Sequence, residues 1–152
     1  MHDTDSPHDE SEHQESAQSA WVEQEQIELR SVGVDIGSST SHLTFSRLVL
    51  RRMGIHLSSR YVVVLREVIH QSPVILTPYL DPLTIDAERL RQFIHDSYAQ
   101  AGVTPVEVDT GAVIVTGEAA RKENAEAILG IFAEEAGRFV CAVAGPHLET
   151  VM

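Results

Sequence analysis

The sequence has little of what several common classes of protein need. Its 152 residues include a single cysteine, Cys141, so an internal disulfide is impossible and the composition fits a reducing compartment. No apolar run approaches the roughly 18 residues of a membrane span, and the acidic N-terminus lacks the apolar segment of a signal peptide. We therefore expect a cytoplasmic protein that has no membrane partner.

Positive charge is also scarce, and the negative charge is unevenly distributed. The chain has 11 Lys and Arg against 23 Asp and Glu, and residues 1–28 hold nine of those acids and no Lys or Arg. Without a large basic field the chain cannot neutralise a phosphate backbone, which excludes nucleic acid as the expected partner. We predict that residues 1–28 form a disordered acidic tail, because they combine one sign of charge with little apolar surface.

Two familiar phosphate-binding motifs are missing as well. The sequence contains neither the Walker pattern G-x-x-x-x-G-K-[ST] nor the Rossmann pattern G-x-G-x-x-G. In their place, Gly37 follows a β-branched run and opens a turn of hydroxyl residues, Ser38, Ser39, Thr40 and Ser41. Glycine lets a backbone approach an anion, and successive N–H groups with added hydroxyls make a concavity that binds one. The pattern fits a phosphate-binding turn, and it fits equally a plain turn between two strands.

Asp35 precedes this turn and is the candidate catalytic residue. A bare carboxylate beside phosphates would repel them unless hydrated Mg²⁺ lay between, so we interpret Asp35 as a water-mediated metal partner. After the turn, Leu43 and Phe45 alternate with polar residues, which predicts a second strand. A hairpin that cradles phosphate is the device of actin-like nucleotide-binding proteins.

The remaining elements follow from periodicity and from residues that begin or end them. The first hairpin runs to about residue 50, residues 51–59 form a loop, and 61–69 is a third strand. Residues 21–29 are either a short helix or a lead-in. Residues 71–82 contain three prolines and are at most an edge segment.

The second half of the chain predicts two helices and two strands. One helix begins near Asp86 and ends before Gly102, with a buried face of Leu90, Phe93, Ile94, Tyr98 and Ala101. A strand at 112–115 leads into a helix at 118–136 that ends at Gly137, with a buried stripe of Ile128, Leu129, Phe132 and Ala133. The last strand is 139–144. Glu118, near the start of the second helix, either faces the phosphates across the strand ends or only complements the helix dipole.

The order β-β-β-α-β-α-β predicts an α/β fold with a mixed five-stranded sheet of the ribonuclease-H-like type. This unit is used once in nucleases and twice in actin-like ATPases. A two-metal nuclease needs several carboxylates at strand ends, but the fourth and fifth strands end in Val115-Thr116 and Ala144-Gly145. The actin-like interpretation is therefore retained.

Four motifs, in this order, resemble the EutA family of ethanolamine ammonia-lyase reactivating factors. They are VGVDIGSSTS at 32–41, QSPV at 71–74, GAVIVTGEAAR at 111–121 and AGPHLE at 144–149. The first motif is shared across the actin-like superfamily, whereas the three later ones point to the family. The similarity covers residues 31–152.

The resemblance implies an ATP-dependent chaperone of bacterial ethanolamine utilisation, which binds ATP or ADP with Mg²⁺. Its partner would be ethanolamine ammonia-lyase with its adenosylcobalamin, from which the factor releases damaged cobalamin. In such a mechanism the nucleotide state changes the affinity for the lyase, and no covalent chemistry on ethanolamine is involved. The expected location is the cytoplasm, in association with a bacterial microcompartment.

The length of the chain affects how well it is expected to bind ATP by itself. Because actin-like proteins close two such units around the nucleotide, residues 29–152 are expected to be the first, N-terminal subdomain of a truncated pair. Alone, it should bind ATP weakly and self-associate through an uncovered apolar face. Two other functions stay open. One is a small-molecule kinase of the acetate or sugar kinase type, which would need a substrate-binding set of acids or arginines that these residues do not show, and the other is an interaction module that binds no nucleotide.

Overall fold

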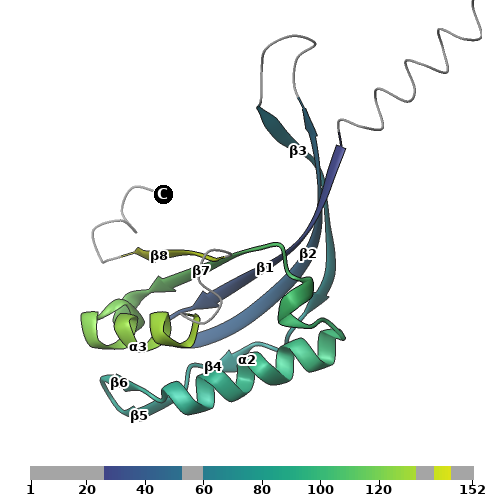
Figure 1. Ribbon diagram of the computed structural model, residues 1–152. Helices are drawn as coiled ribbons and strands as arrows, with labels where there is room; N and C mark the ends of the chain where they lie inside the picture. Colours follow the sequence, from purple (N-terminus) through teal and green to yellow (C-terminus); the bar gives the residue numbers. More distant parts are fainter. Residues whose placement is uncertain (1–25, 53–59, 133–138, 145–152) are drawn as a thin grey trace, which may run out of the picture.

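The computed structural model describes residues 26–52, 60–132 and 139–144 (Figure 1). Five strands lie in the order β3-β2-β1-β7-β8, and β4 pairs with β2 beside them. The strands of this sheet are β1 (Gln26–Ile36), β2 (Thr40–Arg52), β3 (Tyr61–Gln71), β4 (Ile75–Leu76), β7 (Thr110–Thr116) and β8 (Phe139–Ala144). Strands β5 (Tyr79–Asp81) and β6 (Thr84–Ile85) form a separate small ribbon.

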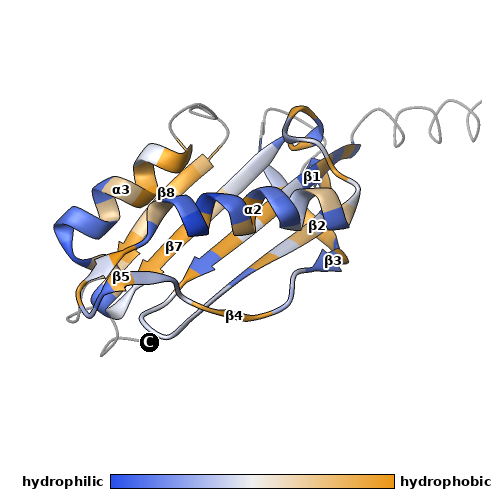
Figure 2. Cartoon of the chain, turned by 90° about the horizontal axis from the view of Figure 1, so that it is seen from below, coloured by the Kyte–Doolittle hydropathy of each residue, from blue (hydrophilic) through white to orange (hydrophobic). Residues whose placement is uncertain are grey.

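The strand directions confirm the predicted mixed sheet. β1, β2 and β3 pair antiparallel, whereas β1–β7 and β7–β8 are parallel. Helix α2 (Ala87–Ala101) lies between β3 and β7 in the chain, and α3 (Lys122–Phe132) lies between β7 and β8. Both helices cover the same face of the sheet, as seen from below in Figure 2. This is the β-β-β-α-β-α-β arrangement of the ribonuclease-H-like and actin-like fold class.

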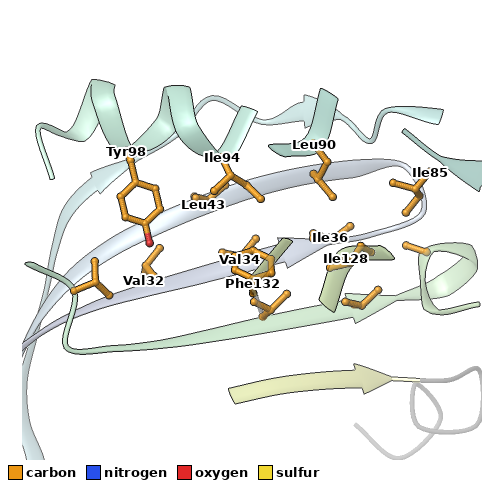
Figure 3. Close-up of a cluster of buried hydrophobic side chains, with 14 of the residues drawn as sticks. Val32, Val34, Ile36, Leu43, Ile85, Leu90, Ile94, Tyr98, Ile128 and Phe132 are labelled. Carbon is orange, nitrogen blue, oxygen red and sulfur yellow. The ribbon is translucent and has the colours of Figure 1, made fainter. Parts of the chain in front are cut away.

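The hydrophobic core lies between this face and the two helices. Alternate residues of the central strands point into it, and Figure 3 shows Val32, Val34 and Ile36 of β1 beneath the helices. Helix α2 contributes Leu90, Ile94 and Tyr98 to the core, and helix α3 contributes Ile128 and Phe132. The intervening strand residues face the opposite side of the sheet, where Ile114 remains 46% exposed.

Helix α2 begins and ends where the sequence predicts. The side chain of Asp86 accepts a hydrogen bond from Arg89 N at 3.1 Å, which caps the first turn. Gly102 has a left-handed φ of 65°, and its N–H donates to the carbonyl of Ala99. Among the described residues, no helix is both long and apolar enough to span a membrane.

Helix α3 differs from the prediction because it begins at Lys122 and not at residue 118. Residues Gly117–Ala120 form a short 3-10 helix, η2, and Arg121 with ψ of 143° separates it from α3. The predicted buried stripe is correct for Ile128 and Phe132 but wrong for Leu129, which is 39% exposed. Ala133, Gly137 and the predicted continuation of this helix through 133–136 lie outside the described residues.

The first hairpin is longer at its open end than the sequence indicates. β1 begins at Gln26, which pairs with Arg51, so residues 26–29 and 51–52 are strand and neither a helix nor a loop. The prediction of a disordered tail over residues 1–28 is therefore wrong for residues 26–28. The ladder continues here although most of these residues are exposed, and Arg47 of β2 forms ion pairs with Glu28 of β1 and Glu67 of β3 in this part of the sheet. The rest of the predicted loop, 53–59, and of the predicted tail lies outside the described residues.

Asn124 is a buried polar side chain that links α3 to the rest of the fold. Its Oδ1 accepts from Ile85 N at 3.0 Å, and its Nδ2 donates to the carbonyls of Leu83 at 2.9 Å and Glu118 at 3.4 Å. Without it, the N–H of buried Ile85 would lose its acceptor. The amide therefore holds the β5–β6 ribbon and η2 against one helix.

We predict that Asn124→Ala lowers the free energy of unfolding by about 1 to 3 kcal/mol, because a buried donor is left unsatisfied. Urea unfolding of the chain would measure the loss. Glu123→Ala, at the exposed neighbouring position of α3, is the matched control and should change stability by less than about 0.5 kcal/mol. Equal effects of the two substitutions would contradict this role for Asn124.

Candidate functional site

The turn between β1 and β2 is short and closed. Gly37 N donates to the carbonyl of Thr40 at 2.9 Å. The last residue pair of the β1–β2 ladder before the turn is Ile36 with Ser41. Ser38, Ser39 and Thr40 are exposed at the tip. The predicted phosphate-binding residues therefore form one tight turn at the carboxyl end of the central strand.

A segment that the sequence reasoning missed holds the carbonyl oxygens of this turn. Thr77 Oγ1 donates to Gly37 O at 2.7 Å, Thr77 N donates to Ser39 O at 2.9 Å, and Tyr79 Oη donates to Ser38 O at 2.9 Å. By contrast, the N–H groups of Ser38 and Ser39 donate to no group within the described part of the chain. Oxygens that would repel an anion are thus engaged, and the N–H groups that would bind one are available.

The three prolines of residues 71–82 made the contacts of Thr77 and Tyr79 with the turn hard to predict from the sequence. They predict an edge segment correctly, since β4 is a two-residue strand paired with Thr40 and Ser41. They do not indicate that the hydroxyl residues on either side of Pro78 reach the turn. Two hydroxyl side chains flanking a proline, close in sequence to a predicted edge strand, would have been the available signal.

Tyr79 keeps its proton over a wide pH range. Burial raises the pKa of its phenol, and the negative charge of Glu118 raises this pKa further. A raised pKa favours the neutral form, so the phenol continues to donate to Ser38 O throughout the physiological range. The same effect shows that Glu118 lies close enough to Tyr79 to act on it electrostatically.

The loop after β7 approaches the turn very closely. Gly117 has a left-handed φ of 58°, and a Cβ at this position would overlap with Ser38 Oγ. A hollow of about 340 Å³ between the two loops is lined by Ser38, Gly117, Glu118, Ala120 and Arg121. The parallel strands β1 and β7 end at the same edge of the sheet, which is why their loops meet.

The structure therefore brings Glu118 to the same hollow as Ser38. Its carboxylate lies 3.6 Å from Arg121 Nη1, and both side chains are more than half exposed, so this ion pair is weak. Gly37 differs from Gly117 because its φ is not left-handed. Its constraint is steric, since a Cβ there would lie 3.2 Å from Thr40 O.

Asp35 is half-buried on the face of the sheet opposite the helices. In register, it lies between His42 of β2 and Ile114 of β7. Within the described residues, its carboxylate has no hydrogen-bond or ion-pair partner, and no group of three or more His, Cys, Asp or Glu side chains gathers to hold a metal ion. One free carboxylate beside a phosphate turn suits Mg²⁺, which is commonly held by one or two carboxylates together with water and phosphate.

Sheet order and the tight hydroxyl turn after the first strand together place the chain in the actin-like class of the ribonuclease-H-like fold. Within that class, the chain belongs to the family described as ethanolamine utilisation protein EutA, whose model matches residues 27–152. This confirms the resemblance seen in the four motifs.

Two curated relatives carry the name ethanolamine ammonia-lyase reactivase EutA. The protein of Escherichia coli is 41% identical and that of Salmonella typhimurium 40% identical, each over 126 residues. The matches cover 82% of this chain and 27% of each relative. The chain therefore spans about a quarter of the length of these relatives.

Solved structures with a similar backbone are more distant. A Ppx/GppA family member from Aquifex aeolicus has a TM-score of 0.46 at 18% identity, over 81% of this chain and 37% of that one. A nucleoside triphosphate hydrolase from Neospora caninum has a TM-score of 0.49 at 12% identity, over 90% and 33% respectively.

We predict that Gly117→Ala lowers the free energy of unfolding by about 1 to 3 kcal/mol, because alanine is strained at this φ. Part of the loss should come from the clash with Ser38, so Ser38→Gly combined with Gly117→Ala should destabilise less than the sum of the single changes. Urea unfolding of the unmodified chain, the two single variants and the double variant would measure these losses as a double-mutant cycle. Gly130→Ala, in an exposed and open position of α3, is the control and should be neutral or stabilising. Strictly additive effects would show that the two loops do not touch.

Proposed function

We propose that this chain supplies the phosphate-binding unit of an ATP-dependent reactivating factor for ethanolamine ammonia-lyase. The observation that carries the proposal is the turn from Gly37 to Thr40. Its carbonyl oxygens are held by Thr77 and Tyr79, while the N–H groups of Ser38 and Ser39 remain available. A turn with this polarity favours an anion, and family membership makes a nucleotide phosphate the best-supported anion.

Each predicted site residue has a role in this proposal. The N–H groups and hydroxyls of Ser38, Ser39 and Thr40 would hold a phosphate of ATP or ADP, and Gly37 would allow the close approach. Asp35 would hold the hydration shell of Mg²⁺, whose charge offsets the repulsion between its carboxylate and the phosphate. Bound Mg²⁺ would supply neutralisation of the phosphate charge.

Glu118 would face the phosphates from the loop after β7, across the hollow that it shares with Ser38. Its negative charge disfavours direct contact with phosphate, so an intervening Mg²⁺ or water is required. Arg121, which pairs with Glu118, limits that repulsion. This arrangement makes the hollow sensitive to the charge of the bound nucleotide.

The relatives' name supports ethanolamine ammonia-lyase as the partner, and the contact between the two loops supports a way in which nucleotide would act on that partner. A nucleotide that contacts both loops would favour the state in which they lie together. If the lyase with damaged cobalamin binds one of the two nucleotide states more tightly, exchange of the nucleotide changes affinity for the lyase and opens the cobalamin site. The chain itself needs no covalent chemistry on ethanolamine.

We predict that Asp35→Asn, made in a full-length protein that contains this chain, abolishes Mg-ATP-dependent reactivation of the inactivated lyase. Loss of one charge-assisted contact of roughly 1.5 to 3 kcal/mol should weaken Mg-ATP binding by about ten- to a hundredfold. Calorimetry would measure the affinity, and recovery of ammonia-lyase activity would measure reactivation. The melting temperature should stay near that of the unmodified protein, since the Asp35 carboxylate has no hydrogen-bond or ion-pair partner among the described residues.

Asp96→Asn, on the exposed surface of α2, is the matched control and should leave both binding and reactivation unchanged. Unaltered Mg-ATP affinity in Asp35→Asn would refute the metal-side role of Asp35. Reactivation without any nucleotide in the unmodified protein would refute the wider proposal and favour an interaction module.

A further inference from the structure

The face of the sheet opposite α2 and α3 is open, and it is hollowed toward the outer strands. Among the described residues, no helix covers this open face. It contains a hollow of about 500 Å³ that spans from β7 across β1 and β2 to β3. The lining is small in the middle of the sheet, at Ser31, Gly33 and Ala112, and apolar toward the outer strands, at Leu48 and Val63. The hollow is therefore shaped to accept a large apolar side chain.

One positive charge lies at the rim of this hollow, and no negative charge faces it. Among the described residues that line the hollow, Arg66 is the only charged one. Arg66 is exposed and forms no ion pair within the described part of the chain. The strand register places Arg66 beside Leu48 of β2, and Leu48 beside Leu29 of β1, so the three form one row across the open face. This surface suits an apolar group that has a carboxylate next to it.

A second row of apolar side chains continues the open face toward the end of the ribbon. Val63 and Arg66 are three residues apart and still share the face, because the register shift between them adds one residue, Val64. Leu65 lies on the opposite face, beside Val49. The second row consists of Ile27, Leu50 and Val63.

The segment that leads into β1 has the chemistry that this surface suits. Residues 1–25 contain eight Asp and Glu and no Lys or Arg, and Trp21 among them is the only tryptophan of the chain. Glu23 and Glu25 follow Trp21 at spacings of two and four residues. In an extended segment these three side chains lie on the same side.

The distance along the chain allows the segment to reach the hollow. Trp21 is five residues before Gln26, the first residue of β1. Five residues span at most about 16 to 18 Å. The row that contains Leu29 and Arg66 is only three residues along β1 from Gln26, which corresponds to about 10 Å. The chain can therefore turn back before Gln26 and still bring Trp21 onto this row.

We propose that residues 21–25 fold back over the open face, with the Trp21 ring on Leu48 and Val63 and against the guanidinium of Arg66. The ring gains apolar contact and an attractive cation at its face. Glu23 and Glu25 complement the charge of Arg66. Because the segment is tethered at the end of the ribbon, its effective concentration at the hollow is high, and a weak contact is sufficient. A second copy of the open face would bring another Arg66 and no carboxylate to the hollow, so it is less complementary.

Fluorescence of Trp21 tests the contact without an added probe, since no other tryptophan contributes. In the unmodified chain, the emission should be blue-shifted and less quenched by acrylamide than in the same chain unfolded in urea. Val63→Asp places a carboxylate beneath the ring, and Arg66→Glu repels the carboxylates of the segment, so each should remove most of the shift. Leu65→Asp is the matched control and should keep the shift, because Leu65 is 46% exposed, close to the 54% of Val63, and lies on the opposite face.

An exchange of charges tests the complementarity directly. Arg66→Glu combined with Glu23→Lys and Glu25→Lys restores opposite charges and should bring the blue shift back. Far-UV circular dichroism checks that each variant folds, and if Val63→Asp does not fold, the loss in Arg66→Glu and its recovery decide the question.

Three results would overturn the proposal. The first is an emission of the unmodified chain that equals that of the unfolded chain. The second is a shift that survives both Val63→Asp and Arg66→Glu, or that Leu65→Asp removes equally. The third is a shift that grows with protein concentration, which would assign the open face to a second copy of the chain.

Discussion

The contact between Thr77 and the turn is the interaction on which the shape of the site depends. Thr77 is almost fully buried, and its hydroxyl contacts both the carbonyl of Gly37 and the hydroxyl of Ser41. Its backbone N–H also reaches Ser39 O. One residue thus fixes three positions of a turn that would otherwise be a flexible hairpin tip, and it fixes them with the carbonyls turned toward the protein. The direction of these dipoles is what makes the turn suitable for an anion.

The same region is connected to the second loop through the small β5–β6 ribbon. The carbonyl of Pro78, next to Thr77, accepts from Asp86 N, and Asn124 joins this ribbon to α3 and to η2. The loop that carries Gly117 and Glu118 is therefore positioned by the same network that supports the turn. Because the fold and the site share these buried hydrogen bonds, substitutions at Asn124 are expected to affect both.

Much of the fold could be predicted from the sequence because its signals are local. Asp86 and Gly102 mark the ends of α2 through caps that involve only nearby residues, and β8 has the predicted bounds. The errors come from interactions between distant segments. Residues Gly117–Ala120 form a 3-10 helix next to Ser38, which is far away in the chain, and the extended Arg121 separates this turn from α3. Thr77 likewise contacts a turn that lies about 40 residues before it in the chain. The family itself was predicted from four short motifs, and the match over residues 27–152 confirms it.

The register shifts between β2 and β3 have a mechanical consequence. They fall between Phe45 and Ser46 and between Val49 and Leu50, where the sheet leaves the helices and continues as an unsupported ribbon. Such bulges concentrate bending and twist in a few residues. The extra residues at the two shifts are Ile69 and Val64 of β3, whereas β2 pairs with β1 without interruption. Bending of the far end of the ribbon would therefore be taken up mainly by β3, and the turn between β1 and β2 would keep its geometry.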